Sequence, residues 1–111
     1  MELDLLPRVT LKGLKAHRTR NGVAWTATVC LDGKRLLGVE NDGNGGCSHF
    51  FPLPGGNHRD VWDFVKQADD EAAEALGAEH SSECFANLLS CMEKGMTALD
   101  AVPVWKAALA A

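Results

Sequence analysis

The sequence predicts an α+β fold in which a four-stranded antiparallel sheet is followed by two to three helices packed on one face of the sheet. Apolar residues alternate with polar ones through the first half of the chain, and recur at helical spacing in the second half. The change of period falls at Gly55-Gly56. The 111 residues, 46% of them hydrophobic, suit a single domain, 1–111, with one core.

Four strands form an N-terminal meander in this prediction, near residues 8–16, 23–31, 34–40 and 47–52. The second shows the clearest alternation and is rich in β-branched residues. Gly13 interrupts the first strand, which is typical of a β-bulge. Asp32-Gly33 is the signature of a type I′ hairpin turn. Antiparallel sheets joined in this way bury one face and leave the other free to contact water.

A first helix is expected near 58–76, where Trp62 and Phe64 widen an apolar stripe. Asn57 is placed to cap its start, and Gly77 is placed to end it. The residues that form the centre of the stripe are Val61, Val65, Ala68, Ala72 and Leu76.

A second helix is expected near 82–95. Gly95 lies inside this range, and because glycine disfavours the helical conformation, the helix could end before it. Thr97 and Asp100 have the spacing of a capping box for a further turn. Pro103 suits the first turn of a final short helix.

Charge is unevenly divided along the chain, whose net charge is −4. Residues 1–35 carry seven Lys/Arg and three Asp/Glu, whereas residues 36–111 carry four and twelve. The sequence therefore predicts a basic side and an acidic side, and each is a candidate interaction surface.

The acidic candidate is a set of carboxylates on the first helix that would dock on a basic surface of a partner protein. The alternative is an ordinary solubilising helix face. The candidate partner-binding residues are Asp60, Asp63, Asp69, Asp70, Glu71 and Glu74.

The basic candidate is a nucleic-acid-binding surface on the sheet, on which Trp25 or Phe50 would stack against bases. The alternative is a solvated surface with Trp25 in the core, because Trp25 shares its strand face with Val29 and Leu31. The candidate nucleic-acid-binding residues are Arg18, Arg20, Lys34 and Arg35.

The segment from Asn41 to Gly46 is a glycine-rich loop between two expected strands. Its polar residues Asn41, Asp42 and Asn44 could surround a phosphate held by backbone N–H groups. The start of the loop resembles that of a calcium loop, but the later glutamate ligand is missing at the required spacing. A plain hairpin connection is the alternative interpretation.

Two pairs of thiol and imidazole groups are candidates for chemical sites. Cys47 and His49 together with His80 and Cys84 would make a Cys2His2 zinc site, although the spacing is irregular. Cys47 with His49 or His58 is the arrangement to consider for nucleophilic catalysis, and no motif surrounds it. We therefore predict free thiols, no metal and no cofactor.

The cellular context follows from what the sequence lacks. No apolar run approaches the roughly 20 residues of a membrane helix, and the short acidic N-terminus does not have the features of a signal peptide. The expectation is a cytoplasmic protein, monomeric or homodimeric, without membrane association.

The segment from Gly22 to Arg35, with Asp32-Gly33-Lys34, and the segment from Val39 to Gly46, with Asn-Asp-Gly-Asn-Gly-Gly, resemble a family of small uncharacterised proteins of phages and other bacterial mobile elements. The resemblance covers roughly the first half of the chain and carries no catalytic motif. It implies a non-enzymatic protein that binds and modulates a host protein, for example as an inhibitor of a CRISPR or other defence component, which is how anti-CRISPR proteins act. The alternative function is a small nucleic-acid-binding protein.

Overall fold

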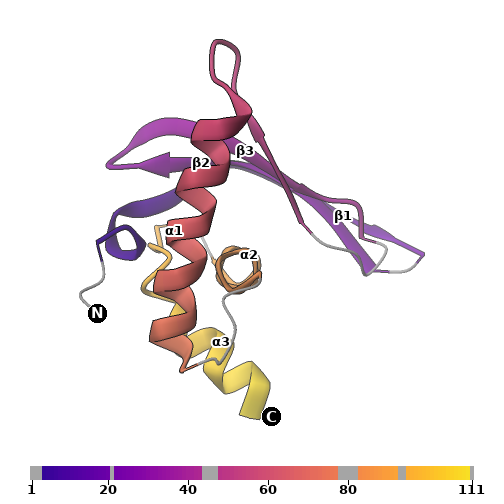
Figure 1. The fold of residues 1–111 in the computed structure, drawn as a ribbon. Helices are drawn as coiled ribbons and strands as arrows, with labels where there is room; N and C mark the ends of the chain where they lie inside the picture. Colours follow the sequence, from indigo (N-terminus) through magenta and orange to yellow (C-terminus); the bar gives the residue numbers. More distant parts are fainter. Residues whose placement is uncertain (1–3, 21, 44–47, 78–82, 93–94, 111) are drawn as a thin grey trace.

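The computed structural model describes residues 4–20, 22–43, 48–77, 83–92 and 95–110. In these ranges it has four antiparallel strands followed by three α-helices, which confirms the predicted α+β class (Figure 1). A short 3-10 helix, η1 (Leu6–Arg8), precedes the sheet. The other elements are β1 (Val9–Thr19), β2 (Gly22–Leu31), β3 (Lys34–Asn41), β4 (His49–Pro52), α1 (His58–Leu76), α2 (Cys84–Ser90) and α3 (Ala101–Ala110).

The sheet is a meander with the order β1-β2-β3-β4. A bulge between Lys12 and Lys15 shifts the register of β1 against β2, and Gly13 within it has a φ of 63°. The predicted bulge is therefore confirmed. Asp32 and Gly33 also have positive φ values of 53° and 82°, as a type I′ turn requires. β1 continues beyond its predicted end, because its last residues pair with β2 as far as Thr19 and Gly22.

Helix α1 has the bounds that the sequence predicts. The Asn57 side chain accepts a hydrogen bond from the backbone N–H of Asp60 at 2.9 Å, which satisfies one of the unpaired donors of the first turn. Gly77 ends the helix with a φ of 69°, in the left-handed region that glycine occupies without strain.

Helix α2 is shorter than predicted, and the expected range of 82–95 is wrong at its C-terminal end. The helix stops at Ser90, whose hydroxyl donates to the carbonyl of Asn87 at 2.6 Å and competes with the helical pattern. Thr97 and Asp100 then form the predicted capping box. The N–H of Thr97 reaches Asp100 Oδ2 at 2.9 Å, and the N–H of Asp100 reaches Thr97 Oγ1 at 3.3 Å.

The core lies between the helices and one face of the sheet (Figure 1). Phe85 of α2 is fully buried at its centre. Its ring stacks on Phe50 of β4 at a centroid distance of 5.8 Å and meets Phe64 of α1 edge-on at 5.9 Å. The prediction that Trp62 belongs to the buried stripe is wrong, because its side chain is 69% exposed on the opposite side of α1.

Candidate functional site

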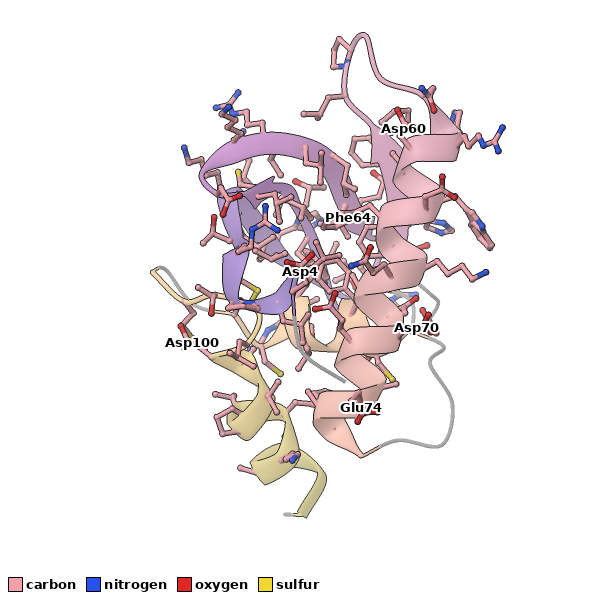
Figure 2. All side chains as sticks on the ribbon, turned by 60° about the vertical axis from the view of Figure 1, so that its left-hand side comes forward. Asp4, Asp60, Phe64, Asp70, Glu74 and Asp100 are labelled. Carbon is pink, nitrogen blue, oxygen red and sulfur yellow. The ribbon has the colours of Figure 1, made fainter. Side chains whose placement is uncertain are left out.

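The outer side of α1 presents an indole surrounded by charges. The exposed residues that share this side with Trp62 are Arg59, Asp63, Lys66, Asp70 and Glu74. We call these six residues the Trp62 face; Figure 2 shows two of them, Asp70 and Glu74, along the helix. Its members follow one another at helical i,i+4 and i,i+3 spacing, so they form one continuous surface. Arg59 and Lys66 make this surface less acidic than the carboxylate count alone predicted.

Glu71 does not belong to the acidic surface, which corrects its assignment as a partner-binding residue. Its side chain is 2% exposed, and Oε1 accepts hydrogen bonds from the backbone N–H groups of Leu5 at 2.7 Å and Leu6 at 3.3 Å. Gln67 donates to Oε2 at 3.1 Å. Glu71 therefore holds η1 against α1. Its position three residues after Ala68, at the edge of the apolar stripe, was the one signal of its burial in the sequence.

Asp69 and Asp60 also have structural roles. Asp69 is half-buried and accepts a hydrogen bond from the backbone N–H of Phe85 at 2.9 Å, so it satisfies a donor in the first turn of α2. Burial raises its pKa to about 6, helped by the charges of Asp70 and Glu83, while the hydrogen bond from Phe85 opposes the shift. Asp60 lies in the first turn of α1, where its carboxylate accepts a hydrogen bond from Asn57 Nδ2 at 2.9 Å.

The start of the glycine-rich loop packs closely on the β1–β2 hairpin. Asn41 Oδ1 accepts from the N–H of Gly43 at 2.9 Å, and Asn41 Nδ2 donates to Ser48 Oγ at 3.2 Å. The Thr19 hydroxyl lies 3.4 Å from the carbonyl of Gly43. These contacts tie the loop to the sheet, while Asp42 is exposed. Asn44, the third predicted loop residue, lies outside the described residues.

The four predicted nucleic-acid-binding residues do not form one patch. Arg18 and Arg20 lie at the β1–β2 turn, whereas Lys34 and Arg35 follow the β2–β3 turn at the opposite end of β2. Ten residues of strand separate the two ends by about 30 Å. The β2–β3 end also carries Asp32, whose carboxylate binds Arg8 with an Nη2–Oδ2 distance of 2.6 Å. This hydrogen bond holds the pKa of Asp32 below its ordinary value.

The structure instead brings together a basic row that sequence reasoning missed. Lys12 pairs with Thr28, Lys15 with Thr26 and His17 with Ala24, and paired residues of an antiparallel sheet point to the same side. The core takes Val29 and Ala27 from the other side of β2. The three basic side chains therefore share the outer face of the sheet, which lies opposite the helices.

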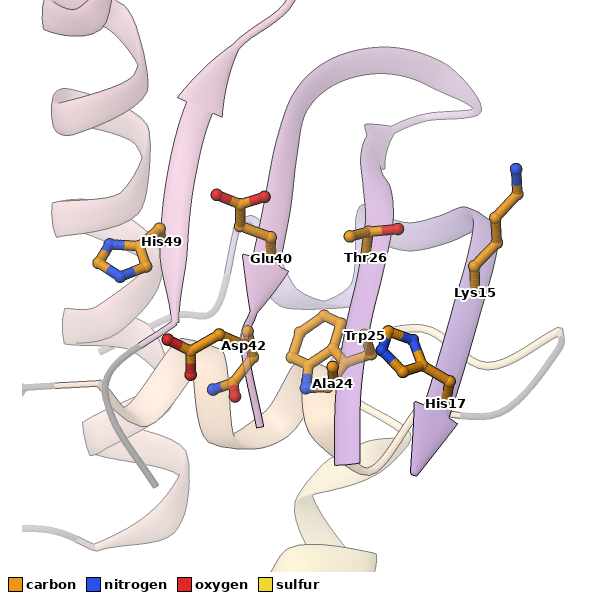
Figure 3. Close-up of a pocket in the computed structure, with 9 residues that line it drawn as sticks. Lys15, His17, Ala24, Trp25, Thr26, Glu40, Asp42 and His49 are labelled. Atoms are coloured by element: carbon orange, nitrogen blue, oxygen red, sulfur yellow. The ribbon is translucent and has the colours of Figure 1, made fainter. Parts of the chain in front are cut away.

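A hollow of about 700 Å³ lies on this outer face (Figure 3). Ala24 and Thr26 of β2 form its floor, and Trp25 also lines it. Figure 3 shows β1 on one side of this floor, and β3 and β4 on the other. We call this hollow the sheet groove; the residues of its two walls are Lys15 and His17 on β1, and Glu40, Asn41, Asp42 and His49 on the β3–β4 side.

The thiol and imidazole groups of the proposed zinc site are only partly described. Cys47 and His80 lie outside the described residues. His49 lies on the outer face, where it pairs with Glu40, whereas Cys84 is buried in the core on the other side of the sheet. Burial raises the pKa of the Cys84 thiol, and the charge of Asp69 raises it further. Among the described residues, no group of three or more metal-ligating side chains is close enough to hold an ion.

Comparison with protein-family models, curated proteins and solved structures gives no match for this chain. The resemblance to small phage proteins therefore stays a prediction. No helix in the described part of the chain combines the length and apolar character needed to span a bilayer.

Proposed function

We propose that this protein is a non-enzymatic interaction protein that docks its Trp62 face on a partner protein. The partner surface would offer an apolar pocket for the indole, bordered by lysine or arginine side chains. A nucleic-acid-binding channel of a host defence component, the class of target that the sequence resemblance implies, supplies the basic side chains. The observation that carries the proposal is the 69% exposure of Trp62.

An exposed tryptophan is a strong candidate for a binding anchor. Tryptophan is enriched among the few interface residues whose truncation costs about 2 kcal/mol or more, and these residues sit in pockets that exclude water. Trp62 is the most exposed of the large hydrophobic residues in the described part of the chain. From this position the Trp62 side chain contributes little to the core, so its presence is better explained by binding than by folding.

The charges around Trp62 favour a basic partner. Asp63, Asp70 and Glu74 outnumber Arg59 and Lys66 on the Trp62 face. Carboxylates around an apolar anchor steer a positively charged surface toward it and raise the association rate, especially at low salt.

The test compares four forms of the protein as bait in a host lysate, followed by affinity measurement with each purified partner. The forms are wild type, Trp62→Ser, the triple variant Asp63→Lys, Asp70→Lys and Glu74→Lys, and the control Val104→Ser. Val104 is also exposed, at 45%, but lies on α3. Exposed substitutions usually change stability by less than about 0.5 kcal/mol, so melting curves should agree.

A partner of the Trp62 face binds wild type and Val104→Ser equally and loses about thirtyfold affinity for Trp62→Ser, the equivalent of about 2 kcal/mol. The triple variant should slow association and reduce its salt dependence. If all four forms retain the same proteins with equal affinity, the Trp62 face is an ordinary solvated surface and the proposal is wrong.

A further inference from the structure

We propose that the sheet groove binds single-stranded nucleic acid, with phosphates along β1 and bases over β2. This inference concerns the face of the sheet opposite the helices and is independent of the Trp62 face. It rests on the alignment of charges across the sheet, on the shape of the hollow, and on the composition of the β1–β2 hairpin.

The bulge at Gly13 creates the basic wall. Residues an odd number apart in a regular strand point to opposite faces, so Lys12 and Lys15 would be separated by the sheet. Because the bulge inserts one extra residue, both lysines pair with threonines on the same side of β2. Both are exposed, as is His17 two residues further along. Phosphates placed along β1 meet Lys15 and His17 in the groove and Lys12 beyond the end of the groove, on the same face of the sheet.

The floor and the far wall suit bases. Thr26 has a short, exposed side chain, so a flat ring can approach the strand there between the longer side chains of β1 and β3. Glu40 pairs with Thr26 and is exposed beside this floor. A glutamate accepts hydrogen bonds from the exocyclic amino group of cytosine. Along the same face, the ring of Phe51 covers Gly38 and is 37% exposed, which leaves an aromatic surface for stacking.

Two features favour a single strand of nucleic acid over other anions. The walls of the groove are about two strand spacings apart, or about 10 Å, which admits one line of bases and excludes a duplex. The segment from residue 9 to residue 31 contains four Lys/Arg and no Asp/Glu, and one of them, Arg20, lies at the turn beyond the end of the groove. A polymer with a negative charge on every unit can contact basic side chains along the whole hairpin. The far wall carries the carboxylates of Glu40 and Asp42, so the phosphates must run along β1. An acidic peptide would lack bases for the floor.

The test is fluorescence anisotropy of labelled probes titrated with the full chain. The probes are oligo(dC) and oligo(dT) of about 12 nucleotides, the corresponding duplex, and a polyglutamate peptide of similar length. The variant Lys12→Glu with Lys15→Glu reverses the basic wall. The control, Lys34→Glu with Arg35→Glu, makes the same change of charge at the other end of the sheet. All four positions are exposed, so both variants should fold, and circular dichroism checks this.

Oligo(dC) should bind wild type, and the basic-wall variant should weaken binding by about tenfold or more, against less than about threefold for the control. The slope of log Kd against log salt should fall by about 1.4 if two phosphate contacts are lost. Glu40→Gln should bring the affinities for oligo(dC) and oligo(dT) closer together.

Three results would overturn the inference. One is equal weakening by the two charge reversals, which indicates only a general effect of net charge. Another is binding of the duplex or of polyglutamate as tightly as the single strand. The third is the absence of measurable binding to either oligonucleotide at low salt.

Discussion

Glu71 Oε1 accepts a hydrogen bond from the backbone N–H of Leu5 at 2.7 Å, across 66 positions of the sequence. Leu5 and Leu6 are buried, and the same carboxylate oxygen accepts from both of their N–H groups. The N-terminal 3-10 helix is therefore attached to the C-terminal half of α1 by one buried side chain.

Glu71→Ala is expected to lower the free energy of unfolding by about 1–3 kcal/mol, because it leaves buried N–H donors without an acceptor. Glu71→Gln keeps a side-chain oxygen and should cost less. Denaturant unfolding at pH 7 measures both, with the exposed Glu74→Ala as the matched control. Equal stability of Glu71→Ala and Glu74→Ala would contradict the role assigned to Glu71.

Asp69 should make stability depend on pH between about pH 4 and pH 6. Its pKa is raised from 3.8 to about 6 in the folded protein, so the folded state binds the proton more tightly than the unfolded state. The corresponding stabilisation is complete below the unfolded value of 3.8 and is lost as the pH rises through about 6.

Asp69→Asn keeps an acceptor for the N–H of Phe85 and removes the titration. The difference in unfolding free energy between wild type and this variant should therefore change across that pH window and be constant above it. Asp70→Asn, at an exposed neighbouring position, is the comparison. If wild type and Asp69→Asn have parallel stability profiles, the carboxyl group does not carry the shifted pKa.

Alanine substitutions at Gly43 and Gly55 should distinguish the stability cost of a positive φ from the additional cost of a steric clash. Both have positive φ values, 81° and 89°. A Cβ on Gly43 would lie 2.8 Å from the backbone nitrogen of Ala24, whereas one on Gly55 would meet nothing within 4 Å. Gly55→Ala should cost about 1–2 kcal/mol, and Gly43→Ala should cost clearly more, because the sheet backbone must shift. Thermal and denaturant unfolding test this, and equal costs would argue against the close approach.

The thiols should differ in reactivity in the native protein. Cys30 and Cys84 are buried, and burial raises the pKa of Cys84, whereas Cys91 is half-buried. Pulsed alkylation followed by peptide mass spectrometry should label Cys91 before the other two, because the thiolate is the reactive form and needs access to the reagent. Denaturation without reductant should make these three thiols, which are the ones in the described part of the chain, react equally. Early labelling of Cys84 would contradict its placement in the core.

Local features of the fold could be predicted from the sequence because they depend on residues close together in the chain. The bounds of α1 follow from Asn57 and Gly77, the β2–β3 turn from Asp32-Gly33, and the bulge from Gly13. In each case a few neighbouring residues supply the hydrogen bond or the positive φ, so the physical cause lies within one short segment.

The candidate sites depended on tertiary structure. The sequence predicts a buried Trp62 and an exposed Glu71, and the structure shows the opposite: the apolar residue is exposed and the charged residue is buried. The hydrophobic period of α1 places both near the edge of the buried stripe, and only the arrival of η1 beside Glu71 decides which side is covered. Likewise, the basic wall of the sheet groove could not be predicted without the length of the bulge. That length decides on which face of the sheet Lys15 and His17 lie.

Composition and periodicity thus determined the α+β class, the order of strands and helices, and the caps of α1, because these follow from short-range propensity and alternation. Tertiary structure alone decided which carboxylates lie on the surface and which basic residues share a face. Burial and register arise from contacts between segments far apart in the chain, such as Leu5 with Glu71, and no local pattern encodes the partner in such a contact.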